Sequence, residues 1–188
     1  MYLFLNMQIA NIILRESLTV IVTTFMCQVY LLLGGNLGDR IQNISKALQA
    51  IENRIGEIAL KSAVYETKAW GVAQQPDYLN LAVVVNTKLK PEEILNKTQQ
   101  IEQELGRKRM EKWGARTMDI DILFFDEEIL NTERLTIPHP LIHVRRFVLL
   151  PLLEIAPNFT HPIFKDSIKN LYLKCDDRLL VEKLNINL

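Results

Sequence analysis

The sequence has little cysteine and no excess of charge of either sign. Cys27 and Cys175 are the only cysteines among 188 residues, and they stand in neither a C-x-x-C nor a zinc-ligand spacing. This excludes a disulfide framework and favours a reducing, cytoplasmic location. Lys and Arg together number 22, as do Asp and Glu, so phosphate binding would require local clusters rather than a global field. We therefore expect a small anionic ligand and no nucleic acid.

A convincing membrane span is also lacking. Residues 18–35 are apolar over about the length of a span, but Gln28 and two threonines interrupt them, and they run into Gly34-Gly35 as a strand does at its end. Arg15 precedes an apolar run, as in a signal peptide, yet no small-residue cleavage site follows it. We predict neither membrane insertion nor export.

The chain has no repeat, low-complexity tract or long linker that would divide it. We interpret residues 1–25 as an N-terminal extension of uncertain order and residues 26–188 as a single domain. A start at Met26 would place the first strand directly at the N-terminus, a hypothesis that mass spectrometry of the natural protein would test.

Patterns of strand and helix alternate along the rest of the chain. Mostly apolar runs predict strands at 29–33, 58–65, 79–89 and 119–125. Apolar residues spaced three and four apart predict helices from about Asp39 to Gly56 and from Pro91 to Gly106. Shorter helices are expected at 145–155 and within 170–188. The order matches a ferredoxin-like βαββαβ core, so we predict an α+β fold with an antiparallel sheet, helices on one face, loops on the other and extra short helices.

Two acids in the fourth predicted strand could bind a metal. Asp119 and Asp121 lie two apart, so both carboxylates point to one side of the strand and could share hard cations such as Mg²⁺. An ordinary solvent-facing strand edge is the plainer interpretation. Basic residues crowd the preceding segment, however, and guanidinium groups beside metal-binding acids suit phosphoryl transfer. These cations are Arg107, Lys108, Arg109, Lys112 and Arg116.

The usual glycine-rich phosphate loops are missing. No G-x-x-x-x-G-K-[ST] occurs, and the glycines at 34–38 do not have the G-x-G-x-x-G spacing, so they favour a tight turn into a helix. Side chains would have to hold phosphates. His139 between two prolines suits a phosphate donor or a structural role, and Tyr78 and Phe147 suit the core or a flat ring, with Asn80 as a paired donor and acceptor.

Several segments, taken together and in order from about Val29 to Pro157, resemble the 6-hydroxymethyl-7,8-dihydropterin pyrophosphokinase family. These segments are Gly35-Asn36-Leu37-Gly38-Asp39-Arg40, Pro76-Asp77-Tyr78-Leu79-Asn80, Glu102 with Gly106-Arg107, Trp113 to Leu123, Pro138-His139-Pro140 and Arg145 to Leu149. The resemblance implies an enzyme of folate biosynthesis that transfers pyrophosphate from ATP to the hydroxymethyl pterin. It also implies two Mg²⁺ ions, and we expect a monomer.

The resemblance assigns roles residue by residue. Asp119 and Asp121 would bind the metal and act in catalysis together with Arg107 and Arg116. Contacts to ATP or anchoring of its loop would come from Gln99, Glu102, Arg109, Trp113, Ile122, His139 and Arg145. The pterin would lie between Tyr78 and Phe147, with Asn80, Thr67, Lys68 and Trp70 at its edge. Two loops, 67–77 and 107–114, are expected to close over both substrates.

Two departures from the family pattern concern loop rigidity rather than the reaction. Ala115 replaces a proline that is common in the family, and Lys68-Ala69-Trp70 differs from a proline-rich version of that loop.

Two rival functions are compatible with parts of the pattern. An RNA-binding module uses the same strand and helix order but needs an aromatic-rich strand and basic charge, which are missing here. A nucleotide-binding regulatory domain without catalysis is the other.

Overall fold

The computed structural model describes residues 26–68, 75–107, 114–186 and 188. The predicted N-terminal extension, residues 1–25, lies outside the described residues. The described strands are β1 (Cys27–Gly35), β2 (Gly56–Lys61), β3 (Val64–Thr67), β4 (Tyr78–Thr87), β5 (Asp119–Phe125), β6 (Leu130–Asn131), β7 (Thr136–Ile137) and β8 (Val181–Leu184). The described helices are α2 (Arg40–Arg54), α3 (Pro91–Glu104), the 3-10 helix η1 (Ile142–Val144), α4 (Arg146–Ile155) and α5 (Ile168–Lys174).

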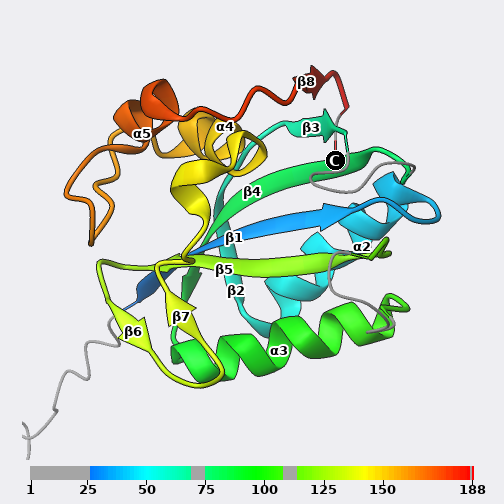
Figure 1. Cartoon of the computed structure of the whole chain (residues 1–188). Coiled ribbons are helices and arrows are strands. Elements are labelled where there is room, and N and C mark those ends of the chain that lie inside the picture. The colour runs from blue at the N-terminus through cyan, green and yellow to red at the C-terminus, as the bar shows by residue number, and fades with distance from the viewer. Residues whose placement is uncertain (1–25, 69–74, 108–113, 187) are drawn as a thin grey trace, which may run out of the picture.

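Six of the described strands form one sheet, and its pairs are antiparallel. The order is β5-β1-β4-β3-β8, and β2 also pairs with β4 (Figure 1). This is the predicted ferredoxin-like order, in which β1 lies between the last core strand and β4. The mixed α+β fold with an antiparallel sheet is confirmed.

Both faces of the central strand β1 are buried. Val29, Leu31 and Leu33 point into a core formed with α2 and α3. Tyr30 and Leu32 point into a second core formed with α4 and α5. A strand covered on both faces needs apolar side chains at every position, which explains the continuous apolar run in the sequence.

Helices α2 and α3 begin where the sequence offers caps. The Asp39 side chain accepts a hydrogen bond from the backbone N–H of Gln42 at 3.0 Å, which caps α2. Pro91 opens α3, and the Glu93 carboxylate accepts from the backbone N–H of Lys90 at 2.8 Å. Gly106 follows α3 with a φ of +84°, a left-handed conformation that suits glycine.

The predicted strand at 58–65 is two strands in the structure. The break lies at Ser62, whose hydroxyl accepts from the backbone N–H of Ala82 at 3.0 Å while its own backbone N–H donates to the Ala82 carbonyl at 2.9 Å. The β2–β4 pairing also shifts register between Ile58 and Leu60. Gly56 begins β2 rather than ending α2.

The two predicted core helices share one face of the sheet, as α2 and α3, but the other face carries α4 and α5 as well as loops. Figure 1 shows α4 and α5 on the face of the sheet opposite to α2 and α3, in agreement with the two separate cores. The tail predicted as a helix contains α5 and then β8, which pairs with β3. The region on the second face that α4 and α5 leave uncovered contains the pocket described below.

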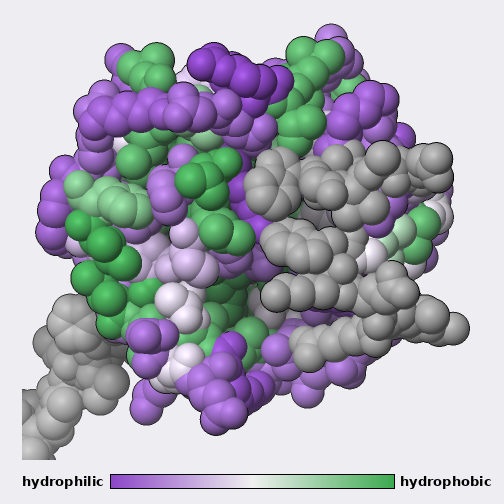
Figure 2. Space-filling view, in the orientation of Figure 1, coloured by the Kyte–Doolittle hydropathy of each residue, from purple (hydrophilic) through white to green (hydrophobic). Residues whose placement is uncertain are grey.

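The surface of the described chain mixes polar and apolar residues. Figure 2 shows hydrophilic and hydrophobic side chains interspersed over the face seen in Figure 1. Among the described residues, no helix has the length and apolar character that crossing a membrane requires. The described end of the predicted apolar stretch, from Cys27 to Gly35, is β1.

Candidate active site

Strand register brings the two acids of β5 beside polar groups of β4. Gly34 of β1 lies opposite Asp119 on one side and opposite Asn80 on the other, and Leu32 lies opposite Asp121. Residues in such a row share one face of the sheet. A Cβ atom at Gly34 would lie 3.0 Å from Oδ1 of Asn80. The absence of a side chain at Gly34 therefore leaves a hollow in the sheet between the acids and the amide.

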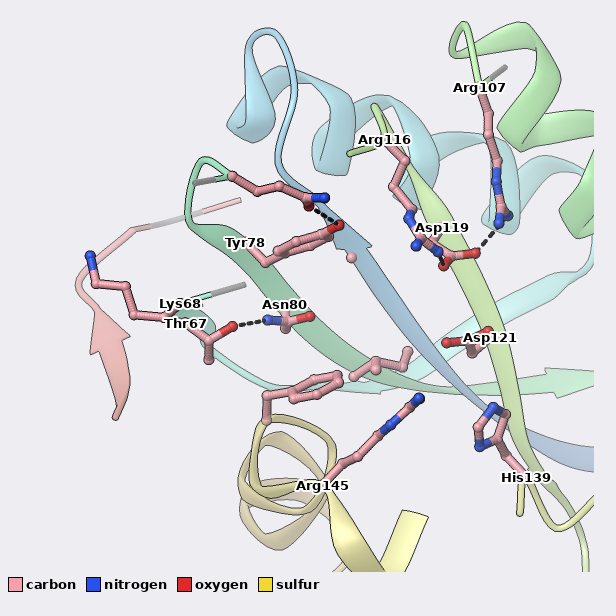
Figure 3. A pocket seen from close by; sticks show the side chains of 14 residues that line it. Thr67, Lys68, Tyr78, Asn80, Arg107, Arg116, Asp119, Asp121, His139 and Arg145 are labelled. Carbon is pink, nitrogen blue, oxygen red and sulfur yellow. Dashed lines mark hydrogen bonds and ion pairs between the residues drawn. The ribbon is translucent and has the colours of Figure 1, made fainter. Parts of the chain in front are cut away.

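A pocket of about 280 Å³ opens over this hollow (Figure 3). Its walls come from the ends of β1, β3, β4 and β5, from the loops beside them and from the start of α4. The lining residues are Leu32, Gly34, Thr67, Lys68, Gln75, Tyr78, Asn80, Arg107, Arg116, Asp119, Asp121, His139, Arg145 and Phe147.

One side of the pocket is a network of acids and guanidinium groups. Arg107 donates to Asp119 at 2.6 Å and to Glu102 at 2.6 Å, and Arg116 donates to the second oxygen of Asp119. Glu102 also accepts from the backbone N–H of Ile120 at 2.8 Å. Figure 3 shows Arg107 and Arg116 reaching Asp119 from neighbouring segments. The network fixes both guanidinium groups at the edge of the pocket, where they can bind anionic oxygens.

Carboxylates are crowded around Asp121. Burial, followed by the charge of Asp119, raises the pKa of Asp121 to about 7. Burial, again followed by the charge of Asp119, also raises the pKa of Glu102 to about 7. A cation bound at Asp121 would offset both effects, because its positive charge would compensate the buried carboxylate and reduce the repulsion between the carboxylates.

The two carboxylates of β5 suit magnesium as ligands. Asp119 and Asp121 offer carboxylate oxygens, the ligands that Mg²⁺ prefers. Among the described residues, no group of three or more His, Cys, Asp or Glu side chains could hold a metal by itself. Mg²⁺ commonly binds through one or two carboxylates and completes its coordination with water and substrate phosphates. The pair therefore fits a metal that arrives with a phosphate-bearing ligand.

The His139 ring is neutral at neutral pH, and hydrogen bonds fix its orientation. Its backbone N–H donates to the carbonyl of Leu123 at 2.9 Å, which holds the residue beside the end of β5. Its Nδ1 atom accepts from the backbone N–H of Leu141 at 3.2 Å, so the proton of the neutral ring is on Nε2. Burial, and then the positive charge of Arg145, lowers the pKa of His139 to about 4. His139 can therefore donate a hydrogen bond from Nε2 at neutral pH.

The other side of the pocket carries aromatic rings and an amide. The Tyr78 hydroxyl lies 3.3 Å from the side-chain oxygen of Gln75 and 3.3 Å from the backbone carbonyl oxygen of Gly114, and it can donate its one proton to either. Asn80 is buried and donates to the Thr67 hydroxyl at 3.0 Å. Figure 3 shows Tyr78, Asn80 and Thr67 across β1 from the acids.

At the start of α4, Phe147 also lines the pocket, and the Arg145 guanidinium carbon lies 5.7 Å from the centre of its ring. A flat polar ring could contact Tyr78 and Phe147 while Asn80 contacts its edge.

Asn36 joins the two sides of the pocket, a role that we did not predict. Its side chain accepts from the backbone N–H of Arg116 at 2.8 Å and donates to the carbonyl of Pro76 at 3.1 Å. Gly35 before it packs closely, because a Cβ atom there would lie 2.4 Å from the carbonyl oxygen of Thr117. The segment at 35–36 therefore holds the loops before Tyr78 and before Asp119 in fixed relation.

The structure brings together most of the residues predicted for the site. The predicted residues that line the pocket are Thr67, Lys68, Tyr78, Asn80, Arg107, Arg116, Asp119, Asp121, His139, Arg145 and Phe147. Three lining residues were missed, namely Leu32, Gly34 and Gln75. The period of two in β1 already places Leu32 and Gly34 on one face, but their opposition to the acids depends on register between distant strands.

Other predicted residues lie outside the lining. Glu102 reaches the pocket through Arg107. The Ile122 side chain is buried in the core on the face of α2 and α3, so only its backbone is available to a ligand from the other side. Gln99 is partly exposed on α3 and does not line the pocket. Trp70, Arg109 and Trp113 lie outside the described residues, as do most of the two predicted closing loops.

The chain resembles a known protein family along most of its length. Residues 30–157 match the model of the 7,8-dihydro-6-hydroxymethylpterin-pyrophosphokinase family. The chain belongs to this family. A 2-amino-4-hydroxy-6-hydroxymethyldihydropteridine pyrophosphokinase of Aquifex aeolicus is 46% identical over 144 residues, which cover 77% of this chain and 89% of the relative. The Haemophilus influenzae protein of the same name is 41% identical over 138 residues, covering 73% and 86%.

Solved structures agree on the fold of the pyrophosphokinase family. The crystal structure of wild-type Plasmodium falciparum HPPK-DHPS matches with a TM-score of 0.65 at 18% sequence identity, over 80% of this chain and 45% of that one. A triple mutant of the same protein matches with a TM-score of 0.64 at 19% identity, over 82% and 45%. The chain spans less than half of these longer proteins, and at such identity the likeness supports the fold alone.

Proposed function

We propose that the pocket binds magnesium-ATP and 6-hydroxymethyl-7,8-dihydropterin next to each other and transfers pyrophosphate between them, giving the pterin diphosphate and AMP for folate biosynthesis. One observation carries this proposal. A single pocket joins two carboxylates and three guanidinium groups on one side to aromatic rings and a buried amide on the other. The first side suits a metal-bound triphosphate and the second suits a planar heterocycle.

The proposed reaction is a displacement at phosphorus. The hydroxymethyl oxygen of the pterin attacks the β-phosphorus of ATP, the bond from that phosphorus to the bridging oxygen of the α-phosphate breaks, and AMP leaves with that oxygen. The hydroxyl proton is released. Phosphoryl transfer asks for little covalent work, so positioning and charge neutralisation by Arg107, Arg116 and Arg145 would provide most of the rate. Neutral His139 would donate from Nε2 to a phosphate oxygen.

Asp119 and Asp121 would hold the metal. When bound there, magnesium would neutralise charge on the phosphate oxygens. The two guanidinium groups that contact Asp119 would then also be available to phosphate oxygens, because the metal would share the charge of the carboxylate. We propose two Mg²⁺ ions, the number that the resemblance to the family implies.

The remaining assignments also stay part of the proposal. Glu102 positions Arg107 through their ion pair, and Gln99, Arg109, Trp113 and the backbone of Ile122 are assigned to the nucleotide. Thr67, Lys68 and Trp70 are assigned to the pterin edge beside Asn80. A single domain at 26–188 is proposed because the sheet and both cores lie between Cys27 and Leu188. The monomer that we expect from the sequence is also part of the proposal. The cytoplasmic location predicted from the sequence stays a prediction.

The proposal is tested by measuring AMP formation from ATP with and without magnesium and with and without the hydroxymethyl pterin. We expect AMP only when all components are present. Asp119→Asn should lower the rate by a hundredfold or more, on the order of 3 kcal/mol of transition-state stabilisation. The matched control is Glu127→Gln, an exposed carboxylate just beyond the same strand, which should be near wild type.

The same assay separates the two rival functions. ATP binding without pterin-dependent turnover would favour a regulatory domain, and absence of both binding and turnover would favour the RNA-binding module. Either outcome, or near-normal turnover of Asp119→Asn, would contradict the proposed function.

A further inference from the structure

The C-terminal part of the chain reaches the pocket walls from behind. Residues 158–188, which include α5 and β8, lie beyond the range matched by the family model. They contact α4 and β3, the two elements that carry Phe147 and Thr67. Within the described chain, residues of this tail do not line the pocket. The tail also packs against β1 and β5, where Phe159 contacts Tyr30 and Phe124. Any effect of the tail on the reaction must therefore pass through the elements that it contacts, and α4 carries two side chains next to the contact.

Helix α4 lacks a cap of its own. Its N-cap residue is Arg145, which makes no side-chain capping hydrogen bond, and the first turn of this described helix contains no acid. The backbone N–H groups at a helix start need acceptors, and a negative charge there is favourable. The sequence around Arg145 provides neither.

Asp177, in the C-terminal tail, provides both the acceptor and the negative charge. Its Oδ2 atom accepts a hydrogen bond from the backbone N–H of Arg146 at 2.9 Å, at the first residue of α4. Its Oδ1 atom accepts from the backbone N–H of Leu179 at 3.0 Å, which orients the carboxylate toward the helix. The carboxylate therefore caps α4 from 31 residues away in sequence.

A second contact holds the same residue. The Arg146 guanidinium donates to the Tyr172 hydroxyl of α5 at 2.6 Å, and its carbon lies 4.8 Å from the centre of the Tyr172 ring. The backbone and the side chain of Arg146 are thus both attached to the tail. Its sequence neighbours, Arg145 and Phe147, both line the pocket.

The segment that carries Asp177 is itself fixed at both ends. Cys175 before it is buried in the second core. After it, β8 pairs with β3, with Val181 opposite Thr67. Lys183 of β8 also forms an ion pair with Glu154 of α4 at 2.9 Å. A carboxylate on an anchored segment can hold a helix end in place, which a carboxylate on a free chain end would do poorly.

We infer that Asp177 is a positioning residue for the transfer reaction, because it fixes the start of α4 and with it the places of Arg145 and Phe147. This inference rests on the proposed function of the pocket. Without the cap, the first turn of α4 frays, and only the ordered fraction of molecules presents both side chains. Apparent affinity falls in proportion to that fraction, while a saturating substrate restores the ordered state.

The test compares Asp177→Ala with two matched variants of the full chain. Loss of a cap typically changes such an equilibrium about fivefold. We expect Asp177→Ala to raise KM for the pterin and for ATP by up to about fivefold and to leave kcat within about twofold. Asp177→Asn keeps a good capping acceptor and should restore most of the affinity. Asp176→Ala, the same change at the exposed neighbour, should behave as wild type.

A binding measurement supports the kinetics. Calorimetric titration with 6-hydroxymethylpterin should show the same loss of affinity in Asp177→Ala and its recovery in Asp177→Asn. The inference is overturned if Asp177→Ala matches Asp176→Ala, if kcat falls while KM is unchanged, or if Asp177→Asn is as impaired as Asp177→Ala. If Asp177→Ala does not fold, Tyr172→Phe removes the side-chain hydrogen bond of Arg146 and should raise KM by up to about twofold. An unchanged KM would then overturn the inference.

The outcomes separate this inference from the proposed function. A wild-type chain without pterin-dependent AMP formation would contradict the proposed function itself. An active wild type whose KM is insensitive to Asp177→Ala would leave the function standing and remove only the positioning role.

Discussion

Asp121→Asn should stabilise the metal-free protein at alkaline pH while abolishing its activity. Burial and the neighbouring charge of Asp119 raise the pKa of Asp121 from its ordinary value of 3.8 to about 7. The difference corresponds to an upper limit of about 4 kcal/mol in the free energy of unfolding. The charges of Asp119 and Glu102 interact with Asp121, so the removal of one charge does not recover the whole amount. We therefore expect the free energy of unfolding of the variant to exceed that of wild type by about 2 kcal/mol at pH 8. An amide has nearly the same shape and carries no charge that must be buried.

The sign follows from the raised pKa. The contribution of Asp121 to stability is fully present below the unfolded-state value near 4 and is lost as the pH rises through about 7. Asparagine does not titrate, so the variant should equal wild type near pH 4 and exceed it by a growing margin up to pH 8. Glu102 and His139 also titrate, the second in the opposite direction, but both are present in both proteins and cancel in the difference to first order.

The assay is urea unfolding of both proteins in the presence of a chelator at several pH values from 4 to 8. Activity is measured in parallel with magnesium, and we expect the more stable variant to be the inactive one. A variant that is less stable than wild type at pH 8, or a difference that does not change with pH, would refute the account of Asp121 as a carboxylate held at a cost for metal binding.

Three further outcomes are expected. Phe147→Ala should weaken pterin binding about tenfold or more, as expected for loss of ring stacking, and leave binding of an ATP analogue within about twofold; equal losses for both ligands, or a similar loss in the exposed control Phe164→Ala, would contradict the ring contact. Gly35→Ala should lower the free energy of unfolding by about 2 kcal/mol or more, because its Cβ atom would lie 2.4 Å from the Thr117 carbonyl oxygen; a wild-type urea midpoint would show that the segment tolerates a side chain. NMR titration of His139 in the metal-free protein should give a pKa of about 4; a value near 6.5 would mean that the ring is charged for part of the working range.

Local patterns in the sequence were enough for the main elements and for the acid pair. The period of two in a strand places Asp119 and Asp121 on one face regardless of what surrounds them, and both line the pocket. The caps at Asp39 and Pro91 are formed by neighbours in sequence, so the starts of α2 and α3 could be predicted. The roles of Tyr78 and Phe147 depended on resemblance to the family, since an aromatic residue alone fits the core equally well.

Features decided by distant contacts could not be predicted. The break at Ser62 depends on a hydrogen bond to Ala82, and the hollow at Gly34 depends on the register of β1 with β5. The packing of α4 and α5 on the second face of the sheet is a choice of tertiary structure that apolar periodicity does not encode. The cap from Asp177 spans 31 residues of sequence and joins the tail to another element, α4.

A crystal structure with magnesium, α,β-methylene ATP and 6-hydroxymethylpterin would test the central claim most directly, since the analogue cannot be cleaved at the reacting bond. The account predicts metal bound by Asp119 and Asp121, phosphate oxygens contacted by Arg107 and Arg116, and the pterin ring between Tyr78 and Phe147. A metal bound away from the two acids, or a pterin ring outside that pair of aromatic side chains, would contradict it.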